Sequence, residues 1–204
     1  MIITKTPFRM SFFGGGTDME EYFRENEGAV LSTTFDKYCY VNVRHLPRFF
    51  DYSTELSYSK TERVTDINDI QHPAIREAMK MLDMREIRLT YEADLPARSG
   101  LGTSSSFAVG MLNAFYALKG KYADKKKLAD EAIYLERVLC NESGGWQDQI
   151  AASFGGFNRI NFNSDGYEVL PVIISPERKK MLNDNLLMFF TGFTRFFFGC
   201  AESK

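Results

Sequence analysis

A glycine- and hydroxyl-rich loop connects a strand pattern to a helix pattern near the middle of this chain. The loop is Gly100-Leu101-Gly102-Thr103-Ser104-Ser105-Ser106, and it follows residues 87–92, in which apolar and polar residues alternate. Apolar residues then recur at helical spacing from Phe107 to Leu118. Glycines permit positive φ and close backbone approach, and the start of a helix favours negative charge. The segment therefore predicts an anion site, with a phosphate chain as the natural ligand.

Another interpretation of the same loop is a simple helix start capped by serine or threonine. The strand before the loop and the density of glycines and hydroxyls favour a phosphate site instead. The loop contains no lysine and lacks the Gly-x-x-x-x-Gly-Lys-Ser/Thr spacing, so it is not a Walker loop.

Two acidic residues come after the helix that follows the loop. Glu136 falls among the apolar residues of a helix pattern over 123–140, where a carboxylate is costly unless it is paired or binds a metal. It could also pair with Arg137 or Lys127 at the helix edge. Asp148 follows a glycine-containing turn. The two carboxylates could serve one site, one binding Mg²⁺ and the other orienting or deprotonating a hydroxyl.

A third cluster of polar residues lies near the N-terminus. Arg9 comes at the end of a strand pattern, and Asp18 follows three consecutive glycines and a threonine. Arg9 could stabilise phosphate charge. Asp18 could accept hydrogen bonds from sugar hydroxyls, cap a short helix, or do both.

The mixed order of strand and helix patterns predicts an α+β fold rather than strict β–α alternation. A chain of 204 residues with 44% hydrophobic residues can bury a real core. Residues 47–69 are expected to be irregular. We expect strands at 2–12, 29–34, 38–45, 87–92, 156–162, 168–174 and 185–190, and helices at 19–26, 72–82, 107–118 and 123–140.

Composition excludes several classes of function. The net charge of −2 gives no electrostatic footprint for nucleic acid, and no apolar run is long enough to span a membrane. The N-terminus lacks a signal-peptide pattern, so we expect a cytoplasmic protein. Three widely spaced cysteines and two histidines make a disulfide framework or zinc site improbable.

Taken together, these segments resemble the GHMP small-molecule kinases, which include galactokinase, homoserine kinase, mevalonate kinase and phosphomevalonate kinase. The resemblance extends from Ile2 to about Phe196. It rests on three motifs in family order: Pro7-x-Arg9 with Gly15-Gly16-Thr17-Asp18, then Pro96-x-x-x-Gly100-Leu101-Gly102-Thr103-Ser104-Ser105, then Gly145-x-Gln147-Asp148-Gln149.

The resemblance implies a function for each motif. The loop residues Gly100, Leu101, Gly102, Thr103, Ser104 and Ser105 would wrap the ATP phosphates. Ser104 and Glu136 would hold Mg²⁺, Asp148 would be the catalytic acid that takes or orients the substrate hydroxyl, and Arg9 would lie near the transferring phosphoryl group. Asp18 would bind substrate hydroxyls, together with the turn at Gly15, Gly16 and Thr17. The implied fold is the GHMP N-terminal domain, a ribosomal-protein domain-2-like mixed sheet packed by helices.

Within the family, the turn Gly14–Asp18 and the segment Thr191–Arg195 resemble the bacterial D-glycero-D-manno-heptose 7-phosphate kinases more than galactokinases. Galactokinases carry Gly-Glu-His-Thr-Asp at the first motif, so two polar sugar contacts are replaced here by glycines. The implied activity is phosphorylation of that heptose phosphate to the 1,7-bisphosphate, with Arg195 as a candidate contact to the substrate phosphate. A kinase for a fucose- or galactose-like sugar is an alternative.

The resemblance also implies a domain boundary and a truncation. Residues 1–175 would form the ATP-binding domain, and residues 176–204 would begin an incomplete C-terminal α+β domain that lacks the third, glycine-rich motif. The sequence after Phe196 departs from the family, and we expect a one-base frameshift near codon 197. The apolar stretch 186–198 would then lack part of its sheet, which predicts poor solubility or self-association.

Two functions of other classes stay open at this point. An inactive nucleotide-binding remnant fits the missing third motif, although such a remnant need not keep Arg9, Asp18, Glu136 and Asp148 together. A Rossmann oxidoreductase built on Gly14–Gly16 is weaker, because these glycines are contiguous rather than spaced as Gly-x-Gly-x-x-Gly.

Overall fold

The computed structural model describes residues 1–96 and 99–189, and within them the chain has the expected α+β architecture. Seven strands form one mixed sheet with the order β4-β3-β5-β2-β6-β7, and β1 pairs with β2. The strands are β1 (Ile2–Phe13), β2 (Gly28–His45), β3 (Thr54–Ser57), β4 (Thr61–Val64), β5 (Ile87–Ala93), β6 (Phe157–Asn163) and β7 (Gly166–Pro171). The helices are α1 (Glu20–Phe23), the 3₁₀ turn η1 (Ile67–Asp69), α2 (Pro73–Met81), α3 (Thr103–Leu118), α4 (Lys125–Ile133), the π-helical η2 (Tyr134–Leu139), α5 (Gln147–Phe154) and α6 (Pro176–Asp184).

Strand β2 is the long central strand of the sheet. It pairs with β1 along one edge, and on its other edge its first half pairs with β6 and its second half with β5, all antiparallel. The sequence predicts two strands here, 29–34 and 38–45. The prediction of two is wrong, because one strand continues through residues 35–37, where the register of the pairing with β1 shifts.

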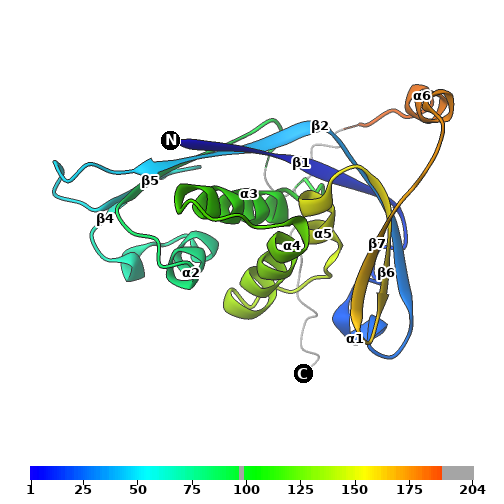
Figure 1. Cartoon of the computed structure of the whole chain (residues 1–204), viewed down its shortest axis with the longest axis horizontal. Coiled ribbons are helices and arrows are strands. Elements are labelled where there is room, and N and C mark those ends of the chain that lie inside the picture. The colour runs from blue at the N-terminus through cyan, green and yellow to red at the C-terminus, as the bar shows by residue number, and fades with distance from the viewer. Residues whose placement is uncertain (97–98, 190–204) are drawn as a thin grey trace.

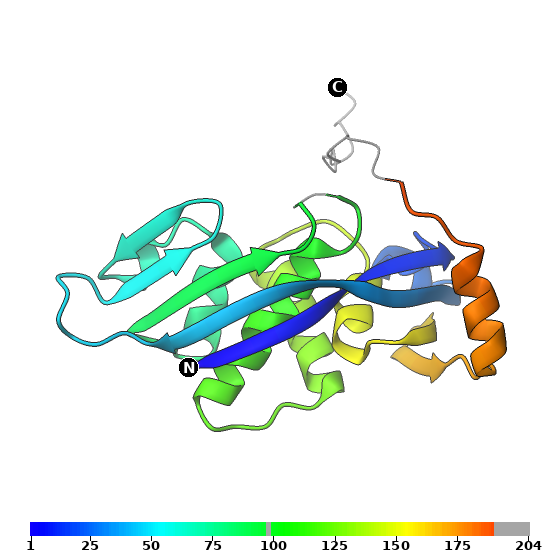
Figure 2. The ribbon, with the colours of Figure 1, turned by 90° about the horizontal axis from the view of Figure 1, so that it is seen from above.

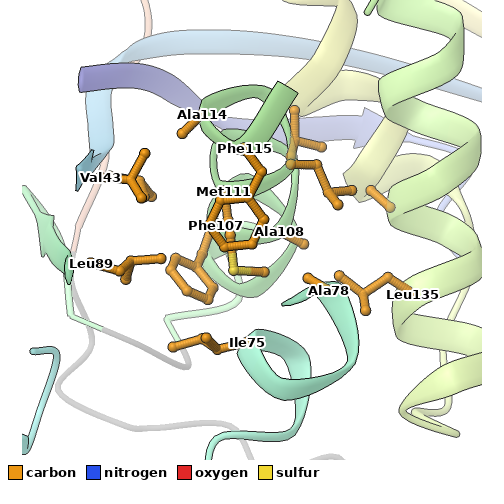
Figure 3. Close-up of a cluster of buried hydrophobic side chains, with 14 of the residues drawn as sticks. Val43, Ile75, Ala78, Leu89, Phe107, Ala108, Met111, Ala114, Phe115 and Leu135 are labelled. Carbon is orange, nitrogen blue, oxygen red and sulfur yellow. The ribbon is translucent and has the colours of Figure 1, made fainter. Parts of the chain in front are cut away.

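Helices α2, α3, α4 and α5 lie on one side of the sheet (Figure 1), and the long strands cross in front of them in the view from above (Figure 2). α3 is the central helix, and its middle turns are buried between the sheet and α2. Figure 3 shows Phe107, Met111 and Phe115 of α3 beside Ile75 of α2 and Leu89 of β5. The apolar helical spacing after the loop therefore predicts the core correctly.

One glycine permits the close packing of α3 on β1. A side-chain carbon at Gly110 would lie 2.6 Å from Thr6 Oγ1, and Thr4 Oγ1 donates a hydrogen bond of 2.9 Å to the Gly110 carbonyl. The absence of a side chain at Gly110 thus allows the helix and the strand to approach closely. This contact fixes the position of α3, and with it the loop at its N-terminus, relative to β1.

Several expected elements differ in the structure. Residues 47–69 contain β3, β4 and η1, because β3 pairs in parallel with β5 and gains a partner that local sequence does not reveal. The helix expected over 123–140 divides into α4 and the π-helical η2, and the helix at 19–26 is the single turn α1. The strand expected at 185–190 is wrong over its described part, where Leu186–Phe189 is exposed coil after the unpredicted α6.

Two further expectations concern the C-terminal region. The boundary near residue 175 stays a prediction; α6, which follows it, has no buried residues. The frameshift segment after Phe196 and most of the apolar stretch 186–198 lie outside the described residues. No helix in the described part of the chain is both long and apolar enough to cross a membrane.

Candidate active site

The glycine loop ends directly at the N-terminus of α3. Gly100 and Gly102 have positive φ of 78° and 71°, a backbone conformation that glycine adopts without strain. The backbone N–H of Arg9 donates to the Leu101 carbonyl at 3.2 Å, and the Ser106 hydroxyl donates to the Pro7 carbonyl at 2.9 Å. β1 therefore holds the loop on both sides of the helix start, and helix dipole and loop amides act at one place.

Arg9 and Asp148 form an ion pair against this loop. Arg9 Nε and Nη2 each lie 2.6 Å from Asp148 Oδ1, and Arg9 Nη1 donates to the Gly100 carbonyl at 3.2 Å. A side-chain carbon at Gly102 would lie 3.1 Å from Arg9 Cγ and 3.5 Å from Asp148 Cγ. The absence of a side chain at Gly102 thus lets the ion pair lie directly on the loop.

Asp148 belongs to the first turn of α5, where sequence patterns indicated a turn rather than a helix. Its side chain is 25% exposed, and that of Arg9 is 14% exposed. A carboxylate in the first helical turn is favoured by the helix dipole. Because both Arg9 contacts go to Oδ1, the second carboxylate oxygen is available to a ligand at the loop.

Glu136 lies in the π-helical turn η2 and is buried, with 1% of its surface exposed. Ser104 Oγ donates to its Oε1 at 3.1 Å and Ser105 Oγ to its Oε2 at 2.7 Å, and Gln149 Nε2 also donates to Oε2. Burial raises the pKa of Glu136, and the hydrogen bond from Ser105 is the first of the contacts that oppose the rise.

The charged partner of Glu136 is Arg137, whose Nη2 lies 3.5 Å from Oε2. Lys127, the other partner considered from sequence, lies 3.9 Å from Glu131 instead. The carboxylate therefore faces the start of α3 rather than the outer surface of its own helix.

The glycine turn before α1 is held by its own side chains. The Thr17 hydroxyl donates to the Gly14 carbonyl at 2.8 Å and accepts from the Ala29 N–H at 3.1 Å. Asp18 is 2% exposed, and its two carboxylate oxygens accept from the Gly16 N–H at 3.0 Å and the Gln147 N–H at 3.1 Å.

The expectation that Asp18 caps the short helix that follows it is wrong. α1 begins after Met19 with no side-chain cap, whereas Asp18 binds the first N–H of α5. A side-chain carbon at Gly145 would lie 1.9 Å from Asp18 Oδ2, so only glycine fits there. The first and third motifs are thus in direct contact, through the hydrogen bond from Gln147 to Asp18 and the close approach of Gly145 to Asp18.

The residues at the start of α3 suit a magnesium ion. Ser104 Oγ and Glu136 Oε1 are adjacent oxygen donors, and Gln149 Oε1 is buried without a partner among the described residues. Within those residues, no three His, Cys, Asp or Glu side chains gather as metal ligands. One carboxylate with a hydroxyl is nonetheless a set that Mg²⁺ accepts when phosphate oxygens and water complete its shell.

Sequence reasoning missed four residues that complete this arrangement: Ser11, Gly145, Gln147 and Gln149. Gly145, Gln147 and Gln149 fall within the third motif, but their contacts with Asp18, Ser11 and Glu136 arise only in the folded chain. The Lys5 ammonium lies over the Tyr38 ring, 3.8 Å from its centre. Arg195 lies outside the described residues.

Known proteins match this chain in both sequence and structure. Residues 70–156 match the family model described as GHMP kinases N terminal domain. D-glycero-alpha-D-manno-heptose 7-phosphate kinase of Campylobacter jejuni is 32% identical, over 95% of this chain and 60% of the relative. L-fucokinase/L-fucose-1-P guanylyltransferase of Bacteroides fragilis is 33% identical over 53% of this chain and 12% of the relative.

A crystal structure of a D-glycero-D-manno-heptose 1-phosphate kinase from Bacteroides thetaiotaomicron superposes with a TM-score of 0.76 at 25% identity, covering 86% of this chain and 61% of that one. The chain therefore has the GHMP kinase fold, and residues 70–156 match the N-terminal domain of that family. Among these relatives it is similar to heptose phosphate kinases over nearly its whole length, and it spans about 60% of the length of theirs.

Proposed function

We propose that this chain forms the phosphate-binding and catalytic part of an ATP-dependent sugar kinase of the GHMP family. The observation that carries the proposal is the meeting of Arg9 and Asp148 on Gly102 at the N-terminus of α3. Phosphoryl transfer mainly requires alignment and charge neutralisation. An arginine, a carboxylate and a helix start at one point supply both.

Each part of the site has a role in this proposal. The loop from Gly100 to Ser105 binds the ATP phosphates through backbone N–H groups and the helix dipole. Ser104 and Glu136 hold Mg²⁺, which would neutralise phosphate charge when bound. Asp148 orients the acceptor hydroxyl and takes its proton, while Arg9 keeps Asp148 in place and balances negative charge beside the transferred group.

The proposed substrate is D-glycero-D-manno-heptose 7-phosphate, phosphorylated to the 1,7-bisphosphate in nucleotide-activated heptose biosynthesis. The similarity to the Campylobacter jejuni enzyme over 95% of this chain supports it. The Bacteroides thetaiotaomicron structure is described as a heptose 1-phosphate kinase, so the acceptor position needs its own test. In this proposal the sugar binds at the turn formed by Gly15, Gly16 and Thr17, which Asp18 supports. Arg195 would contact the substrate phosphate.

A fucose-type sugar is the second candidate acceptor, favoured by the partial match to the Bacteroides fragilis fucokinase. An inactive nucleotide-binding remnant is the third possibility. These three differ in what the full chain does with ATP and sugar. The heptose kinase turns over ATP only with a heptose phosphate, the fucose-type kinase turns it over with fucose, and the remnant binds ATP with no turnover.

The test is a coupled ADP-release assay on the full chain with Mg·ATP and each acceptor, followed by phosphorus NMR of the product. A 1,7-bisphosphate supports the proposal. Turnover with fucose alone, or nucleotide binding without turnover, would contradict it and select one of the other candidates.

A further inference from the structure

Gln147, directly before Asp148, is held through its side-chain amide oxygen and through its backbone N–H. Ser11 Oγ donates to Gln147 Oε1, and the Gln147 backbone N–H donates to Asp18 Oδ2 at 3.1 Å. Ser11 and Arg9 are two residues apart on β1, so they lie on the same face of the strand. β1 thus holds Gln147 with one residue and Asp148 with the other.

The other end of this amide faces the glycine turn. Gln147 Nε2 lies 3.9 Å from the position of a side-chain carbon on Gly15, and nothing lies within 4 Å of such a carbon on Gly16. Both glycines are exposed and Gln147 is half-buried. Among the described residues, Nε2 has no acceptor, so it keeps two N–H groups beside open space.

The two polar side chains of this turn are already engaged. The Thr17 hydroxyl bonds to the backbone of Gly14 and Ala29, and both Asp18 oxygens accept backbone N–H groups. Gln147 Nε2 is therefore a donor that can meet a ligand here without breaking an existing contact. A polar side chain at position 15 or 16 would occupy the same space.

We propose that Gln147 is a specificity-determining residue, whose Nε2 donates a hydrogen bond to a hydroxyl oxygen of the sugar bound over Gly15 and Gly16. This inference rests on the proposed function, because it needs a polyhydroxylated acceptor whose reacting hydroxyl lies at Asp148. Ser11 is a positioning residue that keeps the amide oxygen turned away from the sugar. A neutral amide recognises a hydroxyl and leaves the substrate phosphate to other groups.

The test uses the full chain with Gln147→Met, which keeps side-chain length and removes the donor, and Gln147→Glu, which keeps an acceptor for Ser11. Both variants are expected to raise KM for the heptose phosphate roughly tenfold, the cost of one hydrogen bond. KM for ATP and Tm should stay within error of wild type. Gln71→Met, an exposed glutamine on another part of the chain, is the matched control.

Ser11→Ala separates positioning from direct contact. It should raise the sugar KM less than Gln147→Met does, and it should have no effect in the Gln147→Met background. An unchanged sugar KM in Gln147→Met, or an equal rise in the KM for ATP, would overturn the inference.

Calorimetric titration of heptose 7-phosphate distinguishes this failure from that of the proposed function. Binding that weakens in Gln147→Met, without turnover by wild type, would refute the kinase activity and support the contact. Equal binding by both proteins, or none by wild type, would refute the contact.

Discussion

Asp148 and Glu136 are two carboxylates at one loop, yet the chain holds them in opposite ways. Asp148 is a quarter exposed and paired with a charged arginine in the first turn of a helix. Glu136 is buried in a π-helical turn, where it accepts three neutral hydrogen bonds and has Arg137 Nη2 at a longer 3.5 Å. Its pKa is raised because burial disfavours its charge. The two carboxylates therefore differ in solvent exposure and in the groups that bond to them. This difference fits the roles proposed for them, with the open carboxylate as proton acceptor and the buried one as a ligand of the cation.

The largest expected effect is a loss of turnover when the partly exposed carboxylate of Asp148 is replaced. Asp148→Asn keeps the size of the side chain and removes the proton acceptor, so kcat should fall about 1000-fold, or about 4 kcal/mol in activation free energy. Nucleotide affinity, measured by fluorescence titration, should change little. Asp165→Asn in the β6–β7 turn is the control. Retained turnover in Asp148→Asn would remove the contrast between the two carboxylates.

The next largest effect is expected on stability, at the contact between Gly145 and Asp18. Gly145→Ala places a carbon against the Asp18 carboxylate, so the free energy of unfolding should fall by about 3 kcal/mol. Gly16→Ala is the matched control, because it meets no neighbour within 4 Å and costs only its positive φ, about 1 kcal/mol. Urea denaturation measures both. Equal losses would show that Asp18 yields to the added carbon.

Loss of the Ser105 hydroxyl beside Glu136 should lower the free energy of unfolding more than loss of the Ser104 hydroxyl does. Ser105→Ala removes a buried bond of 2.7 Å to Glu136 and should cost about 2 kcal/mol of unfolding free energy. Ser104 is exposed, so Ser104→Ala should cost less than about 0.5 kcal/mol and weaken Mg²⁺-dependent nucleotide binding instead. The reverse order of stability losses would contradict the assignment of Ser105 to the fold and Ser104 to the ligand.

The smallest expected effect is a slope with pH. The folded pKa of Glu136 lies above its ordinary value, so the folded state binds its proton more tightly than the unfolded state does. Its contribution to stability is complete below the ordinary glutamate pKa and is lost as pH rises through the folded pKa. Glu136→Gln should remove this loss, at most about 1.4 kcal/mol per pH unit, in metal-free denaturation series. Glu21→Gln, on the surface, should leave the slope unchanged, and an identical slope in Glu136→Gln would argue against the raised pKa.

Much of the site could be predicted from sequence because its functional groups lie close together along the chain within each motif. The loop from Gly100 to Ser106 carries its own glycines and hydroxyls, and the structure places it at the start of α3 as expected. Arg9 and Asp148 were expected at one site, and they form an ion pair. Their roles in the reaction stay predictions.

The remaining features depend on partners distant in sequence. Gly145 must be glycine because of Asp18, and the amide of Gln147 is fixed by Ser11, so neither constraint is visible in a local pattern. β3 is a strand because β5 lies beside it. Local periodicity reports which face of a segment is apolar, but it does not report which distant segment will cover that face.

The pairing of β2 also sets the order in which its two edges can find partners during synthesis on the ribosome. β1 and β2 can join as soon as residue 45 has emerged, whereas the edge from Gly28 to Thr33 waits for β6, up to Phe162. An unpaired strand edge is a template for association with other chains. A nascent chain therefore carries this edge open from the time β2 emerges until β6 has followed it.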